Sequence, residues 1–175
     1  MYTIEPCLTA IENMKNRLDK YPNVTIWQGV IGKDNWERDF YMTDEPVNHM
    51  TKKSKGNTLF RNYKEELSGK DEVVKTRVDA LTLDSFCALN GISKIDILKI
   101  NCEGGEYEIF ECEEKDWLGI TQNIILQVHL HSAFEPLELE RVEMKETLIR
   151  SGFRLIPSKK GFESKGNSTQ FWTKS

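Results

Sequence analysis

Acidic and amide side chains follow directly after an apolar segment in the middle of this chain. Asn101 and Glu103 come after residues 95–100, whose apolar and β-branched side chains are typical of a strand covered on both faces. Gly104 and Gly105 then allow the backbone to turn sharply into a helix. Open α/β sheets bind their ligands at the carboxyl ends of their strands, so we expect a binding crevice beside Asn101 and Glu103.

A second set of polar residues alternates along the apolar segment 123–130. Gln127, His129 and His131 occupy every second position, so their side chains share one face near the carboxyl end of the expected strand. A neutral imidazole is the side chain best suited to accept a proton near neutral pH. We expect His131 to reach an open cleft, because it comes later on the strand. The alternative is that one histidine is structural and the other faces solvent.

Glu5 ends a short strand expected at residues 2–5 and precedes Pro6. In nucleotide-binding α/β folds, an acid at the end of a strand accepts hydrogen bonds from ribose hydroxyls. The alternative is a surface acid that is favoured by the N-terminus of the following helix. Spacing alone supports the two interpretations equally.

Strand and helix signals alternate along the chain, as expected for a sheet whose strands are connected by helices. Strands are expected at residues 2–5, 24–30, 36–42, 73–78, 95–100, 123–130, 153–157 and 169–173. The last two of these are expected to pair as an antiparallel hairpin at a sheet edge. Residues 44–72 lose this periodicity and are predicted to form a long mobile loop, which either closes over a substrate or is only a solvated insertion.

Two helices carry more detailed expectations. The spacing of Thr9 and Glu12 predicts a capping box at the start of the first helix. A charged helix over residues 135–150 is expected to present Leu139, Val142 and Ile149 to the core.

Three motifs in chain order carry a family resemblance. They are a Leu-Asp pair within residues 81–86, the segment Ile-Asp-Ile-Leu-Lys-Ile at 95–100, and an acidic-Gly turn followed by a Glu and a helix. This order resembles that of the FkbM-type methyltransferases, which are S-adenosylmethionine-dependent enzymes of the Rossmann-like class. The resemblance is densest from Val78 to His131 and covers most of the chain.

The resemblance implies an α/β fold with a Rossmann-like class I methyltransferase sheet, mostly parallel and with a C-terminal antiparallel hairpin. It assigns Glu5 to the ribose of S-adenosylmethionine and Asn101 to cofactor binding and catalysis. Glu103 and His131 are then expected near the transferred methyl group. The family usually has Asp at the position of Asn101, and an amide cannot act as a base. The alternative for Asn101 and Glu103 is that they only shape the turn by capping backbone N–H groups.

The family's first strand and glycine-rich turn have no counterpart in this sequence. In the family's architecture that strand lies between the strand of Glu5 and the strand at 95–100. We therefore expect two buried strand edges that are unpaired or that meet each other, and such edges are costly in a core.

Two functions from different classes follow. The first is an S-adenosylmethionine-dependent methyltransferase that methylates a hydroxyl group of a small molecule or glycan. The alternative is a non-catalytic remnant or interaction domain with the same fold and impaired cofactor binding, which self-associates through its incomplete sheet. A third option is a metal-dependent enzyme that uses His129, His131 and Glu103.

Composition limits the remaining choices. A length of 175 residues with 38% apolar content is typical of a single globular domain, expected over residues 1–175. The net charge of −4 gives no electrostatic reason to expect nucleic acid or an anionic membrane as a partner. The four cysteines lack paired C-x-x-C spacing, and no apolar run is long enough to span a bilayer. We therefore expect a cytoplasmic protein, unless a missing N-terminal segment carried a targeting or anchor sequence.

Overall fold

A computed structural model gives the fold and describes residues 1–43, 57–59, 73–129, 138–157, 163–164 and 167–174. The strands are β1 (Tyr2–Glu5), β2 (Thr25–Gln28), β3 (Val30–Ile31), β4 (Glu37–Thr43), β5 (Val73–Leu81), β6 (Leu98–Ile100), β7 (Asn123–His129), β8 (Phe153–Ile156), β9 (Glu163–Ser164) and β10 (Asn167–Lys174). The helices are α1 (Leu8–Leu18), α3 (Leu83–Leu89), α4 (Gly105–Glu111), α5 (Asp116–Ile120) and α6 (Glu138–Arg150).

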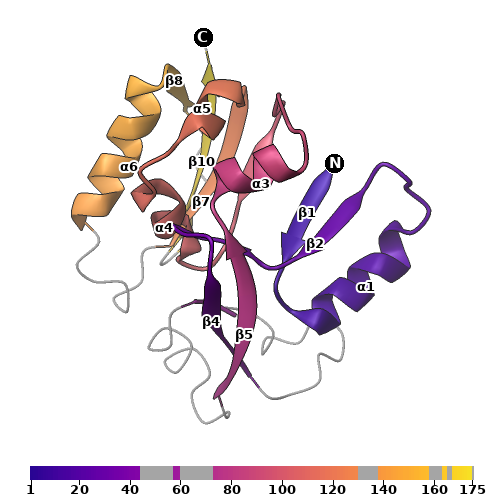
Figure 1. Cartoon of the computed structure of the whole chain (residues 1–175). Coiled ribbons are helices and arrows are strands. Elements are labelled where there is room, and N and C mark those ends of the chain that lie inside the picture. Colours follow the sequence, from indigo (N-terminus) through magenta and orange to yellow (C-terminus); the bar gives the residue numbers. More distant parts are fainter. Residues whose placement is uncertain (44–56, 60–72, 130–137, 158–162, 165–166, 175) are drawn as a thin grey trace.

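The described strands form three sheets (Figure 1). Strands β1 and β2 are parallel, and β5 pairs with β3 in parallel and with β4 in antiparallel orientation. The largest sheet has the order β6-β7-β10-β8, with β9 paired to β10. This mixture of helices with parallel and antiparallel strands confirms the α/β class. The C-terminal pairing is confirmed as well, because β10 is antiparallel to both β8 and β7.

The position of β6 beside β7 brings two groups of polar residues to one edge. The two strands are parallel, and Ile100 is in register with Leu126. Glu103 and His129 each lie three positions beyond these partners in the sequence. The chain therefore delivers them to the same level at the carboxyl ends of neighbouring strands.

Strands β1 and β6 are each paired on one side only among the described residues. Strand β1 pairs with β2, and β6 pairs with β7, but these two strands do not pair with each other. One-sided pairing of these two strands agrees with the expectation, but only Ile100 of the two strands is buried, so the expected burial of both edges is not observed among the described residues. Backbone N–H and C=O groups on such edges lack ladder partners.

The segment expected as one strand at 24–30 is divided into β2 and β3, which join different sheets. The division lies at Gly29, where the chain passes close to β5. A Cβ atom at this position would lie 2.7 Å from the backbone oxygen of Asp79 and 2.5 Å from the Trp27 ring. Only glycine permits this approach, which carries the chain from one sheet to the next.

The main core combines side chains of the sheet that contains β7 with side chains of the helices α3, α4, α5 and α6. Alternate residues of β7 point into it, and Ile124, Leu126 and Val128 are all at most 1% exposed. Trp117 from α5 and Trp172 from β10 complete the packing. Burial of each such large apolar side chain stabilises the fold by about 1.5–3 kcal/mol.

The expected core face of the last helix is wrong. Val142 and Ile149 are 48% and 54% exposed, whereas Met144 and Leu148 are buried. The side chain of Leu139 lies outside the described residues. Met144 and Leu148 are four positions apart and share one face of α6, so the helix packs through this pair. The helix carries apolar residues on more than one face, and its sequence alone does not select which face is buried.

The expected capping box at Thr9 and Glu12 is also wrong. Helix α1 begins at Leu8, its N-cap is Cys7, and the Cys7 side chain makes no capping hydrogen bond. Cys7 and Ile11 are both 4% exposed and lie one turn apart. Their burial places the start of the helix before Thr9 and takes precedence over the local capping signal.

Strand β6 differs from the strand expected at 95–100. Ladder pairing is limited to residues 98–100, while Ile95 forms an isolated bridge to Thr121. Ile97 is 64% exposed, so the expectation of a strand covered on both faces is wrong for this segment among the described residues. The reason is that β6 is an end strand of its sheet.

Most of the predicted loop at 44–72 lies outside the described residues. Within it, residues 57–59 are described, and Thr58 is 1% exposed and bridged to Tyr41 of β4. The Thr58 hydroxyl donates to the backbone oxygen of Glu103 at 2.7 Å. This part of the segment is therefore attached to the turn after β6.

The single domain expected over residues 1–175 stays a prediction.

Candidate active site

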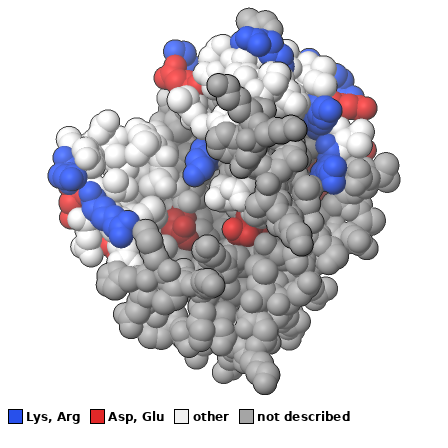
Figure 2. All heavy atoms as spheres, turned by 180° about the vertical axis from the view of Figure 1, so that it is seen from behind, with Lys and Arg blue, Asp and Glu red and all other residues white. Residues whose placement is uncertain are grey.

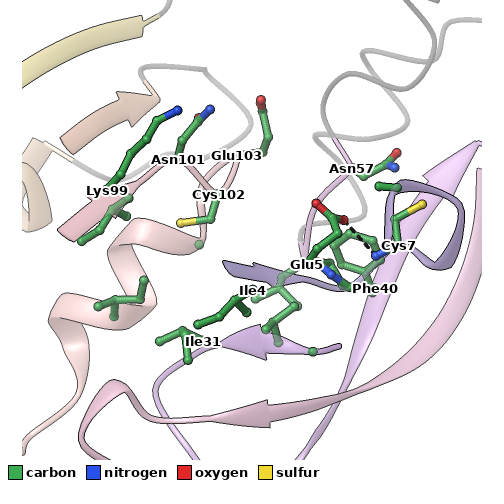
Figure 3. A pocket seen from close by; sticks show the side chains of 18 of the residues that line it. Ile4, Glu5, Cys7, Ile31, Phe40, Asn57, Lys99, Asn101, Cys102 and Glu103 are labelled. Carbon is green, nitrogen blue, oxygen red and sulfur yellow. Dashed lines mark hydrogen bonds between the residues drawn. The ribbon is translucent and has the colours of Figure 1, made fainter. Parts of the chain in front are cut away.

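A cavity of about 580 Å³ lies between the β1 and β6 sides of the molecule (Figure 3). Its volume is within the range typical of small-molecule sites. Its lining comes from β1, α1, β3, β4, β6, the turn after β6, the helices α3 and α4, and the segment 57–59. The lining residues are Ile4, Glu5, Pro6, Cys7, Ala10, Asn13, Met14, Arg17, Gly29, Val30, Ile31, Phe40, Asn57, Leu59, Leu83, Leu98, Lys99, Ile100, Asn101, Cys102, Glu103, Gly105 and Ile109. Mostly apolar walls with a few polar groups suit a partly apolar ligand.

Glu5 lies at the carboxyl end of β1, where the chain turns into α1. Its Oε1 atom accepts a hydrogen bond of 2.9 Å from the backbone N–H of Cys7. Burial raises the pKa of the Glu5 carboxyl, and the Cys7 hydrogen bond partly opposes this rise. The Oε2 atom accepts no hydrogen bond from any described residue. The contact with the helix N-terminus and an oxygen available to a ligand therefore coexist in one side chain.

Asn101 and Glu103 lie across the cavity from Glu5 (Figure 3). Glu103 has a φ of 48° and Gly104 a φ of 97°, so two successive residues adopt the left-handed conformation that makes the sharp turn. The N–H of Gly104 donates to the Oε2 atom of Glu106 at 3.0 Å, and not to Asn101 or Glu103. The capping alternative for these two side chains therefore does not apply to this N–H group.

His129 is fully buried and reaches the same turn. Its Nδ1 atom lies 2.8 Å from Oε1 of Glu106, and its Nε2 atom lies 3.4 Å from Oε2 of Glu103. Burial disfavours the charged imidazole, but hydrogen bonds and charge interactions with Glu103 and Glu106 outweigh it and raise the pKa of His129 to about 9. His129 is therefore an imidazolium near neutral pH and does not fit the role of a neutral base. His131 lies outside the described residues.

Comparison with models of protein families tests the family resemblance that the three motifs indicated. The model of the methyltransferase FkbM domain matches residues 2–155. The chain belongs to this family. The family is one of methyltransferases, and the match includes Glu5, Asn101 and Glu103. No curated protein and no solved structure matches the chain.

Glu106 is the Glu of the third motif in this FkbM domain, but the sequence did not identify it as a site residue. It is 0% exposed and accepts hydrogen bonds from the backbone N–H of His129 at 2.7 Å and from Gly104, in addition to its contact with Nδ1. The thiol of Cys102 also points to it at 3.7 Å. The available signal was its place in the first turn of a helix, where a carboxylate is favoured.

Two further properties of the FkbM domain concern metal ions and membranes. Among the described residues, no group of three or more His, Cys, Asp or Glu side chains is arranged to hold a metal ion. Within the same residues, every helix is too short or too polar to cross a bilayer.

Charge is distributed without a single dominant patch on the described part of one face. Figure 2 shows Lys and Arg side chains there interspersed with Asp and Glu. Ion pairs between exposed or half-buried side chains also occur among the described residues, for example Lys75 with Asp39 and Arg77 with Glu37. The expectation that nucleic acid is not a partner of this chain stays a prediction.

Proposed function

We propose that this FkbM domain is an S-adenosylmethionine-dependent methyltransferase that methylates a hydroxyl group of a small molecule or glycan. The observation that carries the proposal is that Glu5 and Glu103 line one cavity, although Glu5 ends β1 and Glu103 follows β6, a strand of a different sheet. We also place the fold in the Rossmann-like class I group. The order in which β6 is followed by α4 and then by parallel β7 supports this placement.

The residues of the cavity fit the cofactor at the nucleoside end. The Oε2 atom of Glu5 is an acceptor without a hydrogen bond from the described residues, and ribose hydroxyls are donors. Apolar side chains such as Ile31 and Phe40 line the same space. Bound S-adenosylmethionine would supply an electrophilic methyl group on a positively charged sulfur.

The proposed role of the remaining residues is alignment. Asn101 would hydrogen-bond the cofactor or the acceptor, and Glu103 would lie near the reacting oxygen. Fixing the acceptor in line with the methyl carbon and removing water from the cavity are the main contributions that such a site makes. The acceptor hydroxyl must lose its proton as its oxygen bonds to carbon. His131 remains the proposed base for that proton.

Titration calorimetry of the purified chain with S-adenosylmethionine tests the proposal. We expect saturable binding with one site per chain, and weaker binding by Glu5→Gln. S-adenosylhomocysteine, the demethylated product, should compete. Absence of binding for both ligands would reject the methyltransferase proposal.

The incomplete edges of β1 and β6 favour a second candidate, an interaction domain with impaired cofactor binding. Unpaired strand edges are templates for pairing with another chain. The proposed partner is a second copy of this chain, added through these edges. Light scattering at several concentrations tests this, since a monomer throughout would exclude self-association. Calorimetry separates the two candidates, because only the first requires cofactor binding.

A further inference from the structure

We propose that Glu106 is a positioning residue that acts through His129 to hold the carboxylate of Glu103 at the cavity. The inference rests on the proposed function for the reaction that Glu103 serves. Glu106 and His129 do not line the cavity, whereas Glu103 does. The three residues form a chain of contacts from the interior of the protein to the cavity wall.

The contacts of Glu106 orient its carboxylate from both sides. Its Oε1 atom faces the backbone N–H and the Nδ1 atom of His129 at 2.7 and 2.8 Å. Its Oε2 atom accepts from Gly104, the residue that follows Glu103. Glu106 therefore fixes both the imidazole and the backbone of the turn.

The conformation of Glu103 requires such support. A non-glycine residue with a φ of 48° is uncommon, and it persists where its surroundings determine the backbone. Its backbone oxygen accepts from the Thr58 hydroxyl, and its side chain faces Nε2 of His129. The Glu103 side chain is 28% exposed, and Glu103 also lines the cavity, so this residue connects the buried imidazole with the cavity wall.

The charges around His129 are consistent with this arrangement. It faces Glu103 from the turn after β6 and Glu106 from α4, and its backbone oxygen accepts from the Tyr107 hydroxyl. The Gln127 amide, from β7 itself, lies 3.5 Å from Nε2. One imidazolium thus lies between two carboxylates, and removal of either carboxylate is expected to lower the pKa of His129.

A purely structural role for Glu106 is the competing explanation. Helix α4 offers a matched control for it, because Glu108 is also buried and has an ionic partner. Glu108 lies 2.6 Å from Arg38 and takes no part in the contacts of His129. Glu106→Gln and Glu108→Gln remove the same charge from the same helix. Only the first should affect Glu103.

The first measurement is the NMR titration of isotopically labelled histidine. The chain has three histidines, so His49→Gln and His131→Gln assign the signals of His129. We expect the pKa of His129 to fall by about 1–3 units in Glu106→Gln and in Glu103→Gln. It should not change in Glu108→Gln. An unchanged titration in Glu106→Gln would overturn the inference.

The second measurement is methyl transfer at equal folded fraction. We expect Glu106→Gln to lower kcat by about tenfold or more, while cofactor affinity changes by less than about threefold. The double variant with Glu103→Gln should lose little beyond Glu103→Gln alone. Equal losses of kcat in Glu106→Gln and Glu108→Gln would assign Glu106 a structural role and overturn the inference.

Two precautions keep the test decisive. If Glu106→Gln does not fold, Glu106→Asp replaces it, because the shorter acid keeps its charge but retreats from Nδ1. We then expect a smaller fall in the pKa of His129.

If the wild-type chain neither binds cofactor nor transfers methyl groups, the proposed function fails. The response of His129 to the Glu103 and Glu106 variants is measured without cofactor, so it still decides whether these residues are coupled.

Discussion

The Nε2 atom of His129 lies 3.4 Å from the Oε2 atom of Glu103, because β6 and β7 are parallel and in register. This relationship joins a fully buried side chain to the wall of the cavity. It also makes His129 part of an ionic cluster with Glu106. The contribution of these residues to the free energy of unfolding and their contribution to cofactor binding can be measured separately.

Replacing His129 with Gln should destabilise the protein strongly at pH 7. The substitution removes the cation between two carboxylates and leaves the fully buried Glu106 side chain without its ionic partner. Breaking one partner of a buried ion pair costs about 3–5 kcal/mol. Denaturant titration measures this loss in the free energy of unfolding. Arg150→Gln is the control, because its pair with Glu146 is exposed and worth roughly 0.5 kcal/mol or less.

The stability of the wild-type protein should decrease as the pH rises above neutrality. The folded pKa of His129, about 9, is above its ordinary value of 6.5, so the folded state keeps a proton that the unfolded state loses. The resulting stabilisation is fully present below pH 6.5, at roughly 3 kcal/mol, and is lost as the pH rises through 9. Between pH 6.5 and 8 the free energy of unfolding should fall by roughly 1.5 kcal/mol. A constant or rising value over this window would contradict the assignment.

Glu5→Gln should weaken binding of S-adenosylmethionine by about tenfold to a hundredfold, because a charged acceptor is lost from the ribose site. Stability should change little, since burial already disfavours the charged form of Glu5. Calorimetry and thermal unfolding measure the two effects. Glu12→Gln is the matched control, because it removes an exposed carboxylate from the adjacent helix. Equal binding by wild type and Glu5→Gln would exclude the ribose role.

Gly29→Ala should destabilise the protein by about 1–3 kcal/mol, because its Cβ atom would collide with the backbone oxygen of Asp79 and with the Trp27 ring. Gly119 provides the comparison. A Cβ atom there meets nothing within 4 Å, and the residue lies in helix α5. Gly119→Ala should therefore be neutral or stabilise by up to about 1 kcal/mol. Similar effects at both positions would show that close approach at Gly29 does not matter.

Local sequence patterns located most of the strands, whereas the family was indicated by the resemblance of three motifs in chain order. The apolar runs placed β6 and β7, and the Gly-Gly pair marked the turn between Glu103 and α4. These features depend on side-chain type and on backbone freedom, both of which are local. The same information indicated that acids lie at the ends of β1 and β6.

Burial, in contrast, was decided by the tertiary structure. Alternation along β7 placed Gln127, His129 and His131 on one face of the strand. How deeply a side chain on this face is buried depends on the positions of β6 and α4, which come from other parts of the chain. Glu106 acquires its partners only when the turn at Gly104 folds back onto His129. Similarly, Leu148 of α6 is buried and Ile149 is exposed, because only one face of the helix packs against the rest of the protein. Sequence periodicity determines which residues share a face of a helix or strand, whereas contacts between segments distant in the sequence determine which face is buried.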